Sequence, residues 1–120
     1  MKPALCLALA GLAVLAAPAR AADAADPGRA LYEARCGGCH ALAADRVGPR
    51  HAGVLGRKAG SIAGFAYSPA LARSQIVWTE ESLERWLRDP EALVPGQRMN
   101  FRVGDADERR RIVEYLSRNR

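Results

Sequence analysis

The sequence predicts a small all-α domain that folds around a large bound group. Apolar residues recur at helical spacing in three stretches, and a capping residue precedes each of them. Long segments between these stretches are interrupted by glycine and proline. In so short a chain, such loops need something to fill the interior, since a core alone is marginal at this size.

Each expected helix begins at a side chain that can accept a hydrogen bond from the first free backbone N–H groups. Proline then often occupies the first helical position, where its fixed φ suits the helix. The apolar faces include Leu83, Trp86 and Leu87 in one helix and Ile112, Val113, Tyr115 and Leu116 in the last. The expected starts are Asp26, Ser68, Thr79 and Asp105, with one further turn at Asp89 and a capping box between Asp105 and Glu108.

Residues 1–21 are predicted to be a cleaved export signal, which leaves 22–120 as a single domain. Lys2 provides a positive start, positions 5–17 are almost wholly apolar, and Ala19-Arg20-Ala21 fits the small-x-small cleavage pattern. The apolar run is too short to cross a membrane, although a retained anchor is the alternative. We therefore expect no stable membrane insertion, and export to an oxidising compartment, the periplasm.

The charge balance argues against nucleic acid as a partner. The 120 residues include 18 basic and 13 acidic side chains, a net charge of +5, and loss of Lys2 and Arg20 lowers it to +3. The arginines are scattered, and no basic helix carries interleaved aromatic residues.

The stretch Cys36-Gly37-Gly38-Cys39-His40 is the attachment signature of a c-type haem. Each sulfur can add to one haem vinyl group, and His40 follows closely enough to ligate the iron. A zinc site is a poor fit, because four ligands would require His51 as well. A thioredoxin-like dithiol needs a βαβ setting that is not evident here. A plain disulfide remains an alternative for an exported chain, but the adjoining histidine favours haem.

Met99 is the candidate second iron ligand. It lies in the loop Pro95-Gly96-Gln97-Arg98-Met99, and its thioether is a soft, neutral ligand that raises the potential. Core filler is the alternative reading of a lone methionine, and His51 is the rival ligand. Two strong axial ligands would leave no open iron position, so we expect electron transfer rather than an enzyme.

Four further residues are predicted to support the haem. The Pro49 carbonyl can accept a hydrogen bond from the second nitrogen of His40, unless Pro49 is an ordinary turn residue. The Arg57 guanidinium suits a buried propionate, unless it is a solvated loop charge. Tyr67 and Trp78 each offer one donor for the same propionate, or they pack in the core.

Together these residues resemble the class I c-type cytochromes, particularly the short soluble carriers of bacteria and mitochondria. The resemblance extends from about Gly28 to Leu116. It implies the cytochrome c fold, with four to five short helices and loops around one haem c attached through two thioethers. The matching positions are Cys36, Cys39, His40, Gly48-Pro49, Gly56-Arg57-Lys58, Gly64 to Ser68, Pro95-Gly96, Met99 and Phe101.

The resemblance also implies that Arg57, Tyr67 and Trp78 hold the buried propionate. It implies that Gly28 and Tyr32 cross the last helix near Ile112 and Tyr115. Some positions differ from the usual pattern. They are Trp86 in place of a tyrosine, Gln97 in place of a threonine or serine, and His51 at a usually apolar position. The surface around the exposed haem edge, where family members dock their partners, also differs. Its expected basic residues, Arg35, Arg46 and Arg98, are offset by the acidic residues Glu91, Asp105 and Asp107.

The function implied is that of a soluble, monomeric, periplasmic one-electron carrier. Its expected partners are redox proteins such as quinol–cytochrome c reductase, a terminal oxidase, a peroxidase or a reaction centre. One alternative is the electron-entry cytochrome subunit of a periplasmic dehydrogenase complex. Another is a haem sensor or enzyme in which Met99 dissociates.

Overall fold

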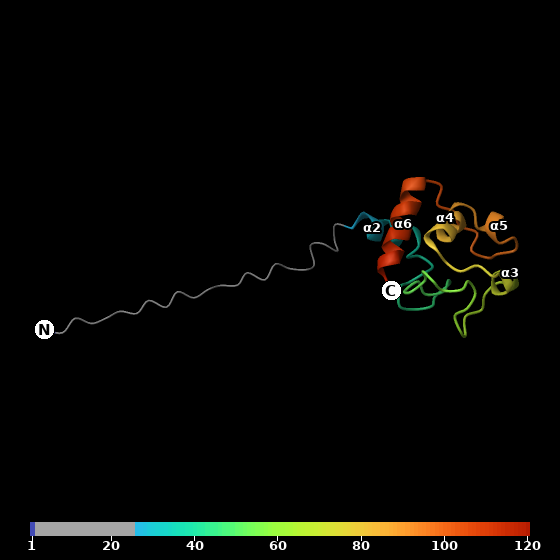
Figure 1. The fold of residues 1–120 in the computed structure, drawn as a ribbon, viewed down its shortest axis with the longest axis horizontal. Helices are drawn as coiled ribbons and strands as arrows, with labels where there is room; N and C mark the ends of the chain where they lie inside the picture. Colours follow the sequence, from blue (N-terminus) through green and yellow to red (C-terminus); the bar gives the residue numbers. More distant parts are fainter. Residues whose placement is uncertain (2–25) are drawn as a thin grey trace.

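The computed structural model describes Met1 and residues 26–120, so the predicted leader and its cleavage site lie outside the described residues. Within the described part the chain forms five helices and an isolated antiparallel bridge between Lys58 and Val77 (Figure 1). The all-α prediction is confirmed. The helices are α2 (Pro27–Arg35), α3 (Pro69–Arg73), α4 (Glu80–Arg88), α5 (Pro90–Leu93) and α6 (Ala106–Arg118).

The helices begin where the capping residues predict. Asp26 accepts a hydrogen bond from the Gly28 N–H at 2.9 Å, and the other four predicted caps make the corresponding bonds. The capping box expected at Asp105 forms only by half, because Glu108 directs its carboxylate to Arg35 instead. A complete box occurs at the start of α4, where Ser82 is the reciprocal partner of Thr79.

Helices α2 and α6 cross closely at Gly28. A Cβ added there would lie 2.6 Å from the Arg111 carbonyl oxygen and 3.0 Å from the Tyr115 Cβ, so only glycine fits without a shift. One turn further along α2, the buried Tyr32 ring lies 5.2 Å from that of Tyr115. The predicted helix crossing is therefore present, and it brings the end of α2 against the core.

Helix α4 packs against α6, and a buried arginine ties both to the preceding segment. Arg109 is 6% exposed and pairs with Glu84 of α4 at 2.7 Å. Its guanidinium also donates to the carbonyl oxygens of Val103 at 2.8 Å and Gly104 at 2.9 Å. These bonds fix the path of the chain at residues 103–104, just before α6.

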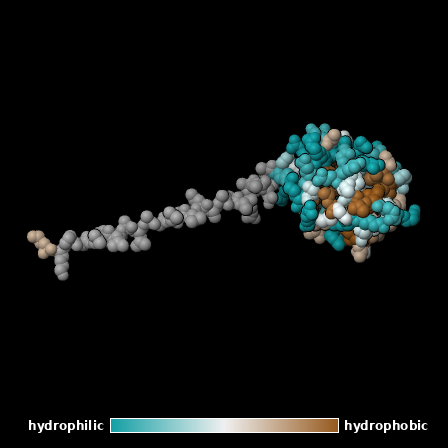
Figure 2. All heavy atoms as spheres, in the orientation of Figure 1, coloured by the Kyte–Doolittle hydropathy of each residue, from teal (hydrophilic) through white to brown (hydrophobic). Residues whose placement is uncertain are grey.

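The remaining chain forms loops that close around the interior on the side away from the α2–α6 crossing (Figure 1). Backbone hydrogen bonds join Gly56 to Trp78 at 2.7 Å and Ala59 to Ile76 at 2.8 Å, which holds two of these loops together. Figure 2 shows hydrophobic side chains visible within one face and framed by hydrophilic ones. Among the described residues, no helix is long and apolar enough to cross a membrane.

Candidate functional site

A largely apolar cavity of about 490 Å³ lies between the helices and the loops. Its volume is within the range of roughly 300–1,000 Å³ that is typical of ligand and cofactor sites. The structure brings all eight residues predicted for the site to this cavity. They are Cys36, Cys39, His40, Pro49, Arg57, Tyr67, Trp78 and Met99.

The two cysteines lie on a turn that continues from the end of α2. The Cys36 carbonyl accepts hydrogen bonds from the N–H groups of Cys39 at 3.1 Å and His40 at 2.9 Å. Both cysteines are free, with Cys36 buried and Cys39 exposed. Burial, together with the neighbouring Cys39, raises the pKa of the Cys36 thiol to about 11.

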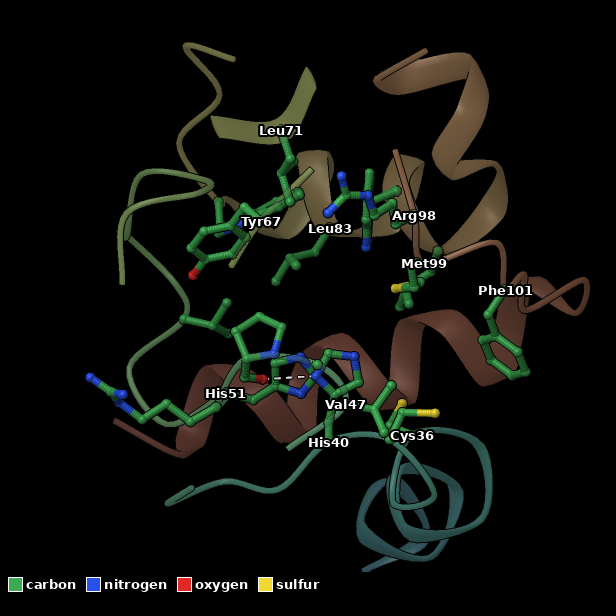
Figure 3. Close-up of a pocket in the computed structure, with 18 of the residues that line it drawn as sticks. Cys36, His40, Val47, His51, Tyr67, Leu71, Leu83, Arg98, Met99 and Phe101 are labelled. Atoms are coloured by element: carbon green, nitrogen blue, oxygen red, sulfur yellow. Dashed lines mark hydrogen bonds between the residues drawn. The ribbon is translucent and has the colours of Figure 1, made fainter. Parts of the chain in front are cut away.

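The His40 imidazole is fixed at one nitrogen. Its Nδ1 donates to the Pro49 carbonyl oxygen at 2.8 Å, which is the contact predicted from the sequence (Figure 3). Burial lowers the pKa of His40, and the hydrogen bond to Pro49 opposes this effect. A neutral imidazole whose Nδ1 carries the hydrogen keeps a free lone pair on Nε2, the form required to ligate a metal.

Gly48 lies directly against the His40 ring. A Cβ built on Gly48 would be 2.1 Å from Cε1 and 2.5 Å from each ring nitrogen. An in-plane atom at the same distance beyond Cε1 would lie farther from both nitrogens, so the short distances place this atom over the ring face. The site therefore requires glycine at this position, a need that the predicted turn did not reveal.

Met99 lies across the cavity from His40 (Figure 3). A buried amide orders its loop: the Gln97 side chain accepts from the Asn100 N–H at 2.9 Å and donates to the Asn100 side chain at 2.8 Å. The same amide donates to Glu91 at 3.0 Å. Gln97 thus organises the loop that contains Met99. This role was not predicted, although the glutamine at a position where the family usually has threonine or serine could have indicated it.

Arg57, Tyr67 and Trp78 also line the cavity. Arg57 donates to the carbonyl oxygen of Arg50 at 2.8 Å and to that of Ala52. The Tyr67 hydroxyl accepts from the Ile62 N–H at 3.2 Å. Arg57 therefore stabilises the loop that contains Pro49, and Tyr67 stabilises the loop at Ile62, roles that the sequence did not predict.

His51 also lines the cavity, beside His40. The two imidazole rings stack with centroids 4.0 Å apart and an interplanar angle of 21°. The His51 Nδ1 lies 3.0 Å from the Tyr32 hydroxyl oxygen. Burial, with smaller effects of His40 and Arg57, lowers the pKa of His51 to about 3, so this ring is neutral at physiological pH.

This arrangement fits a haem. The lining is mainly apolar, two free thiols lie at one edge, and an oriented neutral imidazole lies across from a thioether. No group of three or more potential metal ligands of the His, Cys, Asp and Glu types occurs among the described residues, so the zinc alternative gains no support. Fold and site together define the class of small helical proteins that hold haem through a Cys-x-x-Cys-His segment.

The comparisons with known proteins identify the family. The family model Cytochrome c matches residues 25–119. Cytochrome c2 of Blastochloris viridis is 43% identical over 114 residues, which cover 88% of this chain and 87% of that protein. The chain belongs to the cytochrome c family, and it is a class I c-type cytochrome.

Solved structures share the fold. Cytochrome cH from Methylobacterium extorquens is 38% identical, with a TM-score of 0.72 over 76% of this chain and 94% of that one. Ferricytochrome c2 from Rhodopseudomonas palustris is 34% identical, with a TM-score of 0.73 over 78% of this chain and 96% of that one. The protein therefore has the cytochrome c fold, binds one covalently attached haem c and is an electron carrier.

Proposed function

We propose that this protein is a soluble periplasmic carrier that takes one electron from one redox protein and delivers it to another. The observation that carries the proposal is the pair of oriented side chains, His40 and Met99, on opposite sides of an apolar cavity. When bound, the haem supplies an iron that alternates between the ferrous and ferric states. The chain's own residues attach the haem, ligate the iron and exclude water.

Cys36 and Cys39 are the proposed attachment points. The turn places both thiols at the cavity edge and His40 one residue beyond them. His40 is the proposed proximal ligand, through the Nε2 lone pair. The Pro49 carbonyl keeps the hydrogen on Nδ1 and makes the imidazole a stronger electron donor.

Met99 is the proposed second ligand. Its thioether is neutral and soft, so it favours the ferrous form and raises the potential. The Gln97 amide and Glu91 hold its loop in place, which lets the sulfur keep its position in both redox states. If His40 and Met99 both ligate the iron, no coordination position would remain for a substrate, and we propose no enzymatic activity.

Arg57, Tyr67 and Trp78 are the proposed propionate-binding group. A guanidinium has five N–H donors, and the two backbone contacts of Arg57 leave others for a carboxylate. The Tyr67 oxygen accepts from Ile62 and leaves its own O–H free to donate. A buried carboxylate needs such donors, because unpaired burial of a charge is costly.

The cavity mouth is the proposed docking face. Val47 and Phe101 line the cavity and are 79% and 40% exposed. Of the nearby arginines, Arg35 has its charge compensated by Glu108 at 2.9 Å, whereas Arg46 donates to the neutral Gly37 carbonyl at 2.7 Å and keeps its charge. We propose redox partners with an apolar contact patch, such as quinol–cytochrome c reductase, a terminal oxidase, a peroxidase or a reaction centre, bound without strong electrostatic steering.

The test uses the full chain, exported from a bacterium that has a c-type maturation system. The product should have the mass of residues 22–120 plus one haem, and Cys36→Ala and Cys39→Ala should each lose one thioether. A potentiometric titration should follow a one-electron slope of about 59 mV per decade. Rapid binding of carbon monoxide to the ferrous protein would instead support a sensor or enzyme, and stable co-purification with a large subunit would support the dehydrogenase alternative.

A further inference from the structure

A buried tyrosine and a half-buried histidine meet beside His40, and nothing in the proposed electron-carrier function requires them. Tyr32 of α2 is 4% exposed, and its hydroxyl oxygen lies 3.0 Å from the His51 Nδ1. A buried phenol must donate its hydrogen, and Nδ1 is the acceptor within reach. The bond therefore places the His51 hydrogen on Nε2 and restrains the orientation of this imidazole.

The His40 ring is restrained at three places. Its Nδ1 is bonded to Pro49, Gly48 presses against a ring face, and the His51 ring stacks on it at 4.0 Å. The hydrogen bond to Pro49 alone leaves the ring able to tilt about that contact. A flat neighbouring ring that is itself hydrogen-bonded limits this tilt by stacking, and an aliphatic side chain restrains the ring less well.

The restraint on His51 originates in the helix crossing. Tyr32 packs against Tyr115 of α6 with ring centroids 5.2 Å apart, so its hydroxyl is held by the contact of α2 with α6. A continuous set of contacts thus runs from the helix crossing through Tyr32 and His51 to His40. Residues behind a metal ligand orient it and tune the metal in this way.

We propose that His51, held by Tyr32, is a positioning residue that sets the rotation of the His40 imidazole plane. The inference rests on the proposed role of His40 as the proximal ligand. It also gives His51 a role other than rival ligand. Ligation through its Nδ1 would break the bond to Tyr32 and leave a buried hydroxyl unpaired, and ligation through its Nε2 would displace the hydrogen that this bond places there.

The test compares three variants of the ferric holoprotein by paramagnetic proton NMR and EPR. Tyr32→Phe removes only the hydroxyl, and His51→Leu removes the flat ring. Tyr115→Phe is the matched control, because it removes a hydroxyl from the other ring of the same aromatic pair. The haem methyl shifts and the g-value anisotropy report the orientation of the imidazole plane, which a change in global stability does not move.

We expect the order or spread of the haem methyl shifts to change in Tyr32→Phe and His51→Leu and to stay as in the unmodified protein in Tyr115→Phe. Unchanged shifts and g-values in Tyr32→Phe, with low-spin haem retained, would overturn the inference. Tyr32→Phe decides the question by itself if His51→Leu fails to fold. An unmodified protein without a histidine-ligated low-spin haem would overturn the proposed function and, with it, this inference.

Discussion

His40 donates its Nδ1 hydrogen to the carbonyl oxygen of Pro49 at 2.8 Å, and the residue before Pro49 lies against the face of the same ring. The turn at 48–49 therefore fixes both the edge and the face of the proposed proximal ligand. A ligand restrained in this way needs little rearrangement when the iron changes its charge.

Gly48→Ala tests the contact with the ring face. The added Cβ would lie 2.1 Å from the His40 Cε1, so the ring or the turn must shift. We expect a loss of about 1–3 kcal/mol in the free energy of unfolding, as is typical of overpacking, together with less haem incorporated. Gly104→Ala is the control, because its Cβ would meet no atom within 4 Å. Equal stability of the two variants in denaturant titrations would contradict this account of Gly48.

Arg57→Lys tests the anchoring of the loop that contains Pro49. Lysine keeps the charge but cannot reproduce the forked donation to the carbonyl oxygens of Arg50 and Ala52. We expect a loss of about 1–3 kcal/mol from the unsatisfied carbonyls, measured by denaturant unfolding. The exposed Arg50–Asp45 pair provides the control, since Arg50→Ala should cost no more than about 1 kcal/mol. Similar losses in both variants would mean that Arg57 is an ordinary surface charge.

The helices of this protein could be predicted from the sequence because caps and apolar spacing act over a few residues. The site could be predicted because the haem motif and the Met99 loop are local patterns. The Tyr32–His51 bond could not, since it joins residues 19 apart through the tertiary fold. For the same reason the capping box at Asp105 was predicted in full, although Arg35, 73 residues away, takes up the Glu108 carboxylate.

The Glu91 carboxylate makes the stability of the Met99 loop dependent on pH. Its carboxylate accepts from the Gln97 side chain and the Gly96 N–H, each at 3.0 Å. These hydrogen bonds lower its pKa below the usual 4.5; Arg102 adds a small lowering effect, and burial and Asp89 oppose it. A lowered folded-state pKa means that the contribution to stability is present above pH 4.5 and is lost as the pH falls through the lowered value.

Acidification should therefore loosen the loop and weaken the proposed Met99 ligation. The far-red absorbance of the ferric protein measures this loss. In Glu91→Gln this acid-dependent component should be absent, with weaker ligation already at neutral pH. Glu33→Gln, which alters an exposed ion pair with Arg29, should behave as the unmodified protein does. Identical acid titrations for Glu91→Gln and the unmodified protein would refute the role of Glu91.

The docking face is tested by the rate of electron transfer from purified quinol–cytochrome c reductase. Phe101→Ser and Val47→Ser should slow the bimolecular reaction, because they remove exposed apolar contacts at the cavity mouth. Val77→Ser is the control, since Val77 is also exposed at 48% but does not line the cavity. Equal rates for Val47→Ser and Val77→Ser would place the docking face elsewhere.

Ionic strength provides a separate test of that face. Because Arg35 is paired with Glu108, we expect the rate to fall by less than about tenfold between low and physiological salt. Strongly steered partners gain about 10–10³-fold in rate from electrostatics. A steep salt dependence would contradict the proposed charge-compensated interface.

The ligation of the iron by His40 and Met99 is tested most directly by the far-red optical spectrum of the ferric protein. We predict a low-spin haem with a weak sulfur-to-iron charge-transfer band that is lost in Met99→Ala. A low-spin spectrum without this band in the unmodified protein would contradict the account and direct attention to His51 as a ligand. A high-spin spectrum would also contradict it, because an open iron position belongs to a sensor or an enzyme rather than to a simple electron carrier.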